Sequence, residues 1–231
     1  MKFVGKAVLV ALVLLLSACS SVQRVKERFT VDLRAARVPA GMTEAEFDAP
    51  FSKAGLTKGE IEAVYFPADD AVCLKFRHNF TTHYLFWNRM NRMAFTAALR
   101  AYKTEYEQRS LAGSNLRNKR KYGTERAYLI WETSQYSVQG IGHPNVELGY
   151  QFKKDSPYFS ITLRETPNED DVSKGITPQS SNMVVYFIRE QADAIAALFD
   201  QAYLDSLRPA QLLSPPPVET DFDSPYTEGE F

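Results

Sequence analysis

The sequence predicts an α+β fold, in which an antiparallel β-sheet is packed on one face by a long central helix and a C-terminal helix. Three observations predict this class. Several short segments alternate apolar and polar residues, as strands with one buried face do. Two longer segments repeat their apolar residues at helical spacing. The predicted strands follow one another through short turns, so an antiparallel sheet with helices on one face and a polar opposite face is expected.

The chain before the long helix predicts a helical turn and a hairpin. Two Thr-x-x-Glu patterns, beginning at Thr43 and Thr57, fit the capping-box spacing, and a short helical turn is expected near 43–54. Residues 61–66 and 71–77 flank the turn sequence Pro-Ala-Asp-Asp. Because the second arm alternates apolar and polar side chains, these two segments predict a β-hairpin.

The longest regular stretch runs from Tyr84 to Leu111. Trp, Met and Ala residues recur in it at helical spacing and no Pro or Gly interrupts it, which predicts an amphipathic helix of about six turns, twice the average length. Gly113 follows as an end signal. We expect the apolar stripe of this helix to pack in the core. The alternative is a ligand pocket between the stripe and the sheet.

The second half of the chain predicts four strands and a final helix. The strands share apolar runs or period-two alternation and are expected at 127–133, 146–152, 158–164 and 183–188. The last of them is continuously apolar and is therefore expected in the centre of the sheet. Helical spacing between Glu190 and Leu207 predicts the C-terminal helix. Polar loops are expected at 114–124 and 166–182.

The opening of the chain has the features of a secretory signal peptide. Lys2 and Lys6 precede an unbroken apolar run, residues 7–16, which is too short to cross a bilayer. The sequence Leu-Ser-Ala-Cys that ends at Cys19 resembles the lipobox of bacterial lipoproteins. The resemblance implies cleavage before Cys19, a diacylglycerol on its sulfur, and an acyl chain such as palmitate on its amino group. Two or more such chains hold a protein firmly on a membrane.

The resemblance also implies a place in the bacterial cell envelope. Ser20 stands where enterobacterial lipoproteins retained at the inner membrane carry aspartate, so the outer membrane is favoured, on its periplasmic or its surface face. With residues 1–18 as the signal peptide, the chain divides into a lipidated tether (19–41), a single α+β domain (42–209) and a disordered, Pro-rich acidic tail (210–231).

Composition argues against some classes of function. The chain carries 27 basic and 28 acidic residues, and this balance argues against nucleic acid as a partner, because phosphate binding requires a basic surface. Once Cys19 carries lipid, Cys73 is the remaining cysteine, so no internal disulfide is expected. A buried apolar role for Cys73 is favoured over a reactive thiol.

Two groups of side chains are candidate binding residues. His78 and His83 lie in the sequence His-Asn-Phe-Thr-Thr-His and are candidate ligands of zinc or copper, although no third ligand is close in the sequence. Four basic residues that follow the long helix are candidate contacts for a lipid head group or an acidic partner: Arg117, Lys119, Arg120 and Lys121. No familiar catalytic motif occurs, so no cofactor is expected and an enzyme is the less favoured class.

Three functions are compatible with these features. The leading hypothesis is a membrane-anchored, non-catalytic binding or structural module of the envelope that presents loops 113–124 and 166–182 to a protein or lipid partner. The first alternative is a carrier that holds an apolar or lipid ligand between the sheet and helix 84–111. The second is a metal-binding protein or enzyme that uses His78 and His83.

Overall fold

The structure is a computed structural model that describes residues 28–49, 55–111, 119–133, 138–169 and 179–208. In these residues one ten-stranded antiparallel sheet runs in the order β5-β8-β9-β12-β1-β2-β3-β4-β6-β7. Its strands are β1 (Val38–Asp48), β2 (Leu56–Phe66), β3 (Ala71–His78), β4 (Thr81–Trp87), β5 (Lys119–Arg126), β6 (Tyr128–Thr133), β7 (Val138–Gly142), β8 (Asn145–Lys153), β9 (Ser156–Leu163) and β12 (Met183–Phe187). Two short strands, β10 (Thr166–Pro167) and β11 (Gln179–Ser180), pair separately.

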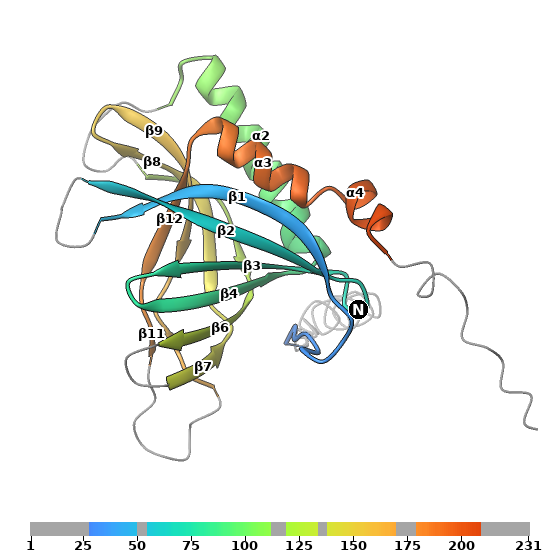
Figure 1. The fold of residues 1–231 in the computed structure, drawn as a ribbon. Helices are drawn as coiled ribbons and strands as arrows, with labels where there is room; N and C mark the ends of the chain where they lie inside the picture. Colours follow the sequence, from blue (N-terminus) through green and yellow to red (C-terminus); the bar gives the residue numbers. More distant parts are fainter. Residues whose placement is uncertain (1–27, 50–54, 112–118, 134–137, 170–178, 209–231) are drawn as a thin grey trace, which may run out of the picture.

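The described residues also form three helices, α2 (Arg89–Glu107), α3 (Arg189–Leu198) and α4 (Gln201–Ser206). Figure 1 shows the sheet strongly curled, with α2 and α3 side by side against it and α4 beyond α3. Helix α2 begins after Asn88, whose side chain accepts a hydrogen bond from the Asn91 amide, while the Asn91 side chain accepts one from the Asn88 amide. This reciprocal cap fixes where the preceding strand ends and the helix starts.

The predicted fold class is wrong, because the molecule is mainly β. About half of the described residues lie in strands and about a quarter in helices. The expected arrangement of a sheet under a long central helix is replaced by a curled ten-stranded sheet that accounts for most of the structure. The physical reason is that several segments without a clear strand pattern gain their hydrogen bonds from strands far away in the sequence.

Three segments account for most of the difference. Of the predicted helical turn near 43–54, residues 43–48 lie instead in β1, whose residues Ala45 and Phe47 point inward between outward-facing glutamates, and residues 50–54 lie outside the described residues. Residues 119–124, expected in a loop, belong to β5, which pairs with β8. The long helix starts at Arg89 rather than at Tyr84, because residues 84–87 complete β4. It ends at Glu107.

Other expectations are confirmed. The hairpin of β2 and β3 forms around residues 67–70, and that of β8 and β9 forms as an antiparallel pair. The apolar strand β12 lies in the interior of the sheet, between β9 and β1. The C-terminal helix is divided in two, because Asp200 has an extended backbone and its side chain accepts a hydrogen bond from the Tyr203 amide, which starts α4.

The main core fills the concave face of the curled sheet. Phe95 of α2 lies with its ring centroid 5.9 Å from that of Trp87, 5.2 Å from that of Phe159 and 5.1 Å from that of Phe199. All four side chains are buried. The helices therefore close the concave face with aromatic rings, which contribute both apolar area and favourable edge-to-face contacts.

The opposite, convex face is not polar throughout, contrary to expectation. Outward-facing residues of four neighbouring strands form a second buried cluster: Phe66, Ala71, Cys73, Phe86, Tyr128 and Ile130. Phe29 and Val31 of the N-terminal segment, residues 28–37, pack against this cluster. The segment is held there by His143, whose Nε2 lies 2.8 Å from the Phe29 carbonyl oxygen and whose Nδ1 lies 2.9 Å from Glu169.

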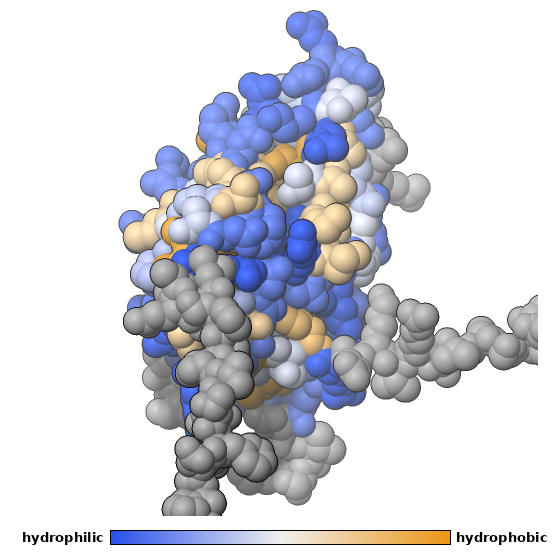
Figure 2. Space-filling view, turned by 90° about the vertical axis from the view of Figure 1, so that its right-hand side faces the viewer, coloured by the Kyte–Doolittle hydropathy of each residue, from blue (hydrophilic) through white to orange (hydrophobic). Residues whose placement is uncertain are grey.

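The surface shown in Figure 2 carries both polar and apolar residues. Figure 2 shows that hydrophilic residues predominate on the side that lies to the right in Figure 1, with apolar residues in small patches between them. Large exposed apolar side chains, such as Met42, Phe80 and Met90, come from different elements. Within the described ranges, no helix is both long enough and apolar enough to cross a membrane.

Candidate functional site

A cavity of about 540 Å³ lies on the convex face, between the N-terminal segment and strands β2, β3, β4 and β6. We call it the convex-face pocket. Its volume lies in the range of about 300–1,000 Å³ in which proteins hold small molecules. Leu33 and Pro39 contribute to the wall on the N-terminal side, while the sheet forms the floor. The pocket is therefore built from a segment near the start of the described chain and from strands that follow much later.

The floor of the convex-face pocket is apolar because of the strand register. Val64, Cys73 and Phe86 stand opposite one another on β2, β3 and β4, so their side chains form one row on the outward face. Phe66 of β2 and Ile130 of β6 also line the floor. Side chains in register on neighbouring strands lie about 4.5–5.5 Å apart, so the row is continuous.

A polar row follows immediately along the strands. Glu62, Lys75 and Tyr84 are in register on β2, β3 and β4 and line the same pocket. Lys75 Nζ lies 2.9 Å from Glu62 Oε2, and this contact raises the pKa of Lys75. The Tyr84 hydroxyl donates a hydrogen bond of 3.2 Å to Glu132 on β6. The pocket thus has an apolar end and a polar end, as a site for an amphiphile requires.

Arg37 is the remaining charged group of the pocket. It lies just before β1, it is exposed, and within the described part of the chain it has no ion pair or hydrogen-bond partner. Its positive charge acts on the Cys73 thiol, as does that of Lys75, so both cations lie within electrostatic range of the floor. Arginine is charged at all accessible pH values. The pocket therefore contains a permanent cation that is free to bind an anion.

Cys73 is buried, as the sequence predicts, and its thiol is free. Burial, reinforced by the negative charge of Glu62, raises the pKa of this thiol to about 12. Because the thiolate is the reactive form of cysteine, a thiol that stays protonated at neutral pH is a poor nucleophile and a poor metal ligand. Cys73 serves the pocket as apolar surface.

A second cavity, of about 430 Å³, adjoins the polar end. Glu62 and Lys75 line both cavities, and the second one continues past Met42, Arg77 and Thr82. The two cavities thus form a hollow along the convex face. Its lining is apolar at one end and charged at the other.

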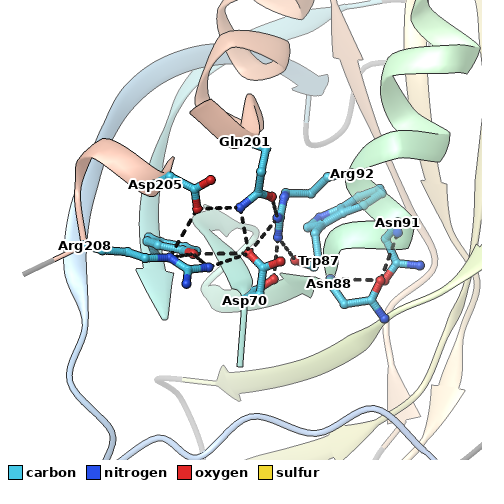
Figure 3. Close-up of polar contacts among 9 residues, drawn as sticks. Asp70, Trp87, Asn88, Asn91, Arg92, Gln201, Asp205 and Arg208 are labelled. Atoms are coloured by element: carbon cyan, nitrogen blue, oxygen red, sulfur yellow. Dashed lines mark hydrogen bonds and ion pairs between the residues drawn. The ribbon is translucent and has the colours of Figure 1, made fainter. Parts of the chain in front are cut away.

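An extended group of polar contacts lies elsewhere, where the turn between β2 and β3 meets the helices (Figure 3). We call it the Arg92 clamp. Arg92 is almost completely buried, with only 2% of its side chain exposed. It donates to the Asp70 carbonyl oxygen at 2.6 Å, to the Asp70 carboxylate at 2.9 Å and to Gln201 Oε1 at 2.7 Å. A buried charge needs such partners, because desolvation otherwise costs several kcal/mol.

The clamp extends to the end of α4. The Asp70 carboxylate also accepts a hydrogen bond from the Tyr65 hydroxyl, and Arg208 donates to that hydroxyl at 2.9 Å. Gln201 donates to Asp205 in the same group, as Figure 3 shows. Asp70 has a left-handed backbone with φ of 45°, a conformation that Asp tolerates better than most residues. The clamp joins the β2–β3 turn to α2 and α4, which is a structural role.

The candidate metal ligands His78 and His83 lie in aromatic surroundings. His83 is buried on the concave face, stacked on Phe76 with ring centroids 5.4 Å apart. His78 stacks on Phe47, at 5.7 Å. Within the described residues, no group of three or more His, Cys, Asp or Glu side chains is arranged to hold a metal ion. Both histidines thus pack against aromatic rings of the core.

The basic residues after the long helix are only partly described. Arg117 and the lipidation candidate Cys19 lie outside the described residues. Lys119 and Arg120 lie in β5, an edge strand of the sheet. Lys121 is exposed, with its Nζ 3.7 Å from Glu147. Charged side chains on an edge strand protect an open sheet from pairing with other chains, which accounts for Lys121 without a ligand.

Comparison with known proteins gives a family. Residues 26–206 match the model of a family described as "Uncharacterised Treponema protein". The chain belongs to this family. The match begins beyond the lipobox-like sequence and covers nearly all of the described fold.

One curated relative comes from Treponema pallidum (strain Nichols) and is described as an uncharacterized protein. It is 26% identical to this chain over 150 residues, which are 61% of this chain and 53% of the relative. The chain therefore spans about half the length of the curated relative that it matches. No solved structure matches the chain.

The convex-face pocket was missed in the sequence, although a signal for it exists. Residues 71–74, 85–87 and 128–131 are apolar at consecutive positions. Such runs, unlike strict alternation, indicate strands buried on both faces. The first run contains Cys73 and the second contains Phe86, so the outward-facing half of these runs is the floor of the pocket.

Proposed function

We propose that this family member is a lipid-anchored protein of the bacterial cell envelope whose domain binds a small ligand with an apolar body in the convex-face pocket. The observation that carries the proposal is the pocket itself. It has a volume of about 540 Å³ and an apolar floor that lies next to a row of polar side chains. Apolar walls with a few placed polar groups are the usual composition of small-molecule sites.

The proposed anchor suits this position of the pocket. Residue 28, where the described chain starts, follows Cys19 by nine residues. Because a chain spans at most about 3.5 Å per residue, the N-terminal segment lies within roughly 30 Å of the lipidated cysteine. A ligand that leaves a membrane or enters it would thus have a short path to the pocket. The outer membrane remains the favoured location, by the lipobox-like sequence.

The chemistry of the pocket supports binding more than catalysis. The Cys73 thiol is held protonated, and Glu62 is paired with Lys75. Glu132 is exposed and accepts a hydrogen bond from Tyr84. An exposed carboxylate lacks the dry, enclosed surroundings of a catalytic acid. The proposal is accordingly a binding module without catalysis.

The carrier hypothesis is kept in this proposal, with the ligand pocket at a different place in the fold. The sequence placed its pocket between the sheet and helix 84–111, but the aromatic rings around Phe95 fill that interface. The convex-face pocket lies on the other side of the sheet, with a floor drawn from residues that face away from α2. The ligand is therefore proposed to sit under the N-terminal segment.

Titration with N-phenylnaphthylamine, a neutral probe whose fluorescence rises in apolar sites, tests the proposal. The protein is the mature chain, residues 19–231 with Cys19→Ser, which contains every described residue. We expect saturable binding to one site. Val64→Trp places a large side chain on the pocket floor and is expected to weaken binding at least tenfold, since Val64 is only half-buried and lines the cavity.

Val184→Trp is the matched control. Val184 is also a half-buried valine on a strand, but it lies on β12, away from the convex-face pocket. Its replacement is expected to leave binding of the probe unchanged. Unsaturable binding, or equal effects of the two substitutions, would contradict the proposal.

A further inference from the structure

We infer that the ligand of the convex-face pocket is a single-chain amphiphile with an anionic head group, held by Arg37. The inference rests on the proposed function and names the class of ligand. The shared chemistry is one alkyl chain joined to a carboxylate or a phosphate. A free fatty acid and a lysophospholipid are the two sources of such a molecule.

The charges of the pocket carry this inference. Four ionisable side chains of opposite signs surround the floor: Arg37, Glu62, Lys75 and Glu132. Glu62 and Lys75 neutralise each other at 2.9 Å, and Glu132 accepts a hydrogen bond from Tyr84. Arg37 is the member without a partner among the described residues. The four charges sum to zero, but the Arg37 guanidinium is the one charged group whose hydrogen-bonding groups have no partner among the described residues, so it is the group that can pair with an anion on a ligand.

The position of this charge fits an amphiphile. Arg37, Lys75 and Glu62 line the pocket together with Cys73, so an anion bound beside Arg37 meets two cations and one carboxylate, and that carboxylate is already paired with Lys75. The guanidinium offers a planar fork that binds carboxylate or phosphate through two parallel hydrogen bonds. From that point the apolar row runs on to Phe86, and Ile130 of β6 also lines the floor. A head group at Arg37 thus leaves the alkyl chain on the apolar floor.

The size of the convex-face pocket limits the number of alkyl chains that a ligand can have. A cavity of about 540 Å³ suits one drug-sized body, and a lipid with two long chains exceeds it. The adjoining cavity at the polar end gives room for a head group larger than a carboxylate, past Arg77 and Thr82. The site therefore accepts either source, and binding experiments distinguish them.

The test compares ligands with a twelve-carbon chain that differ only in their head group, at concentrations below micelle formation. Isothermal titration of the mature chain with Cys19→Ser uses laurate, lauroyl lysophosphatidylglycerol, dodecyl maltoside and dodecyltrimethylammonium. We expect at least one of the two anionic ligands to bind tenfold or more tightly than the neutral and cationic ligands. The tighter of the two anions identifies the source.

Arg37→Gln is the decisive variant. It removes the charge at an exposed position, so the fold should persist, and we expect at least tenfold weaker binding of the anionic ligand with unchanged binding of dodecyl maltoside. Arg34→Gln is the matched control, because Arg34 is also exposed and lies in the same segment but does not line the pocket. It is expected to leave both affinities unchanged.

The outcomes separate this inference from the proposed function. If the neutral probe and all four ligands fail to bind, the proposed function is wrong. If the neutral ligands bind but the anions bind no more tightly than the cation, or if Arg37→Gln and Arg34→Gln behave alike, the inference about the head group is overturned while the pocket remains a binding site.

Discussion

Arg92 is a charged residue that the fold keeps almost fully out of water. Its guanidinium donates to two backbone carbonyl oxygens, a carboxylate and an amide oxygen. These partners come from the β2–β3 turn, from the end of β4 and from α4. One side chain thus ties together segments that are far apart in the sequence, and its removal leaves several buried acceptors without a donor.

We predict that Arg92→Met lowers the free energy of unfolding by about 3 kcal/mol, the usual cost of breaking a buried ion pair. Urea denaturation followed by tryptophan fluorescence measures the change. Arg100→Met is the control, since Arg100 is exposed on the same helix, and it is expected to change stability by less than about 0.5 kcal/mol. Equal effects of the two substitutions would show that the Arg92 clamp does not stabilise the fold.

His83 makes stability depend on pH. Burial, with a smaller contribution from the charge of His78, lowers the pKa of His83 from 6.5 to about 4. Between these two values the unfolded chain binds the proton and the folded chain does not. Stability is therefore lost as the pH falls below about 6.5.

We predict that the wild-type chain loses roughly 2–3 kcal/mol through this residue between pH 7 and pH 4.5, at 1.36 kcal/mol for each pKa unit. In His83→Leu, which keeps an apolar side chain against Phe76, this part of the acid sensitivity should disappear. Urea denaturation at both pH values gives the difference between the two proteins. The same loss in both would show that His83 stays neutral in the unfolded chain as well, or titrates normally in the folded one.

At the scale of elements, the close contact of β6 and β7 depends on a glycine. Gly140 stands opposite Trp131 in this pair, and the indole ring lies where a β-carbon would be. A β-carbon built at Gly140 falls 2.2 Å from Trp131, which is far inside contact distance. Glycine in a strand often marks such a close approach, and the aromatic ring covers the exposed backbone.

We predict that Gly140→Ala destabilises the protein by roughly 1–3 kcal/mol, as overpacking of a filled site does. Gly123→Ala, in β5, is the matched control, because a β-carbon there meets no atom within 4 Å. Thermal unfolding followed by circular dichroism compares the two variants. A Gly140→Ala protein as stable as Gly123→Ala would mean that the β6–β7 pair does not hold Trp131 in this position.

The elements predicted correctly are those whose information is local. The β2–β3 hairpin has a turn sequence between its arms, and β8 and β9 show period-two alternation. By contrast, β1 owes its strand conformation to β2 and β12, and β5 owes its own to β8. The capping pattern in β1 and the cluster of charges in β5 indicate other structures than a strand. A short sequence pattern gives no information about the strand with which a segment will pair.

At the scale of the whole molecule, the sheet is buried on parts of both faces. The concave face carries the helices, and the convex face carries the N-terminal segment and the pocket beneath it. The sequence predicts a tether over residues 19–41, yet residues 28–37 cover the second apolar cluster and β1 starts at Val38. The four charged residues of the pocket, Arg37, Glu62, Lys75 and Glu132, come together only in the folded sheet. No local sequence motif therefore indicates the site.

The proposed anchor leads to a prediction for the intact cell. Cys19→Ser removes the sulfur that would carry the diacylglycerol, so the protein is expected to move from the membrane pellet to the soluble fraction after lysis and a high-salt wash. Immunoblotting of the two fractions measures the distribution. A variant that still pelleted with membranes after that wash would contradict lipid anchoring at this cysteine.

The central claim is that the convex face, under the N-terminal segment, holds the ligand. Its most direct test is photocrosslinking of the lipidated chain in membrane vesicles with a diazirine-bearing fatty acid, followed by peptide mass spectrometry. We expect crosslinks to residues of the pocket floor, around Val64, Phe86 and Ile130, that an excess of unmodified fatty acid suppresses. Crosslinks confined to the helices, or insensitive to competition, would contradict it.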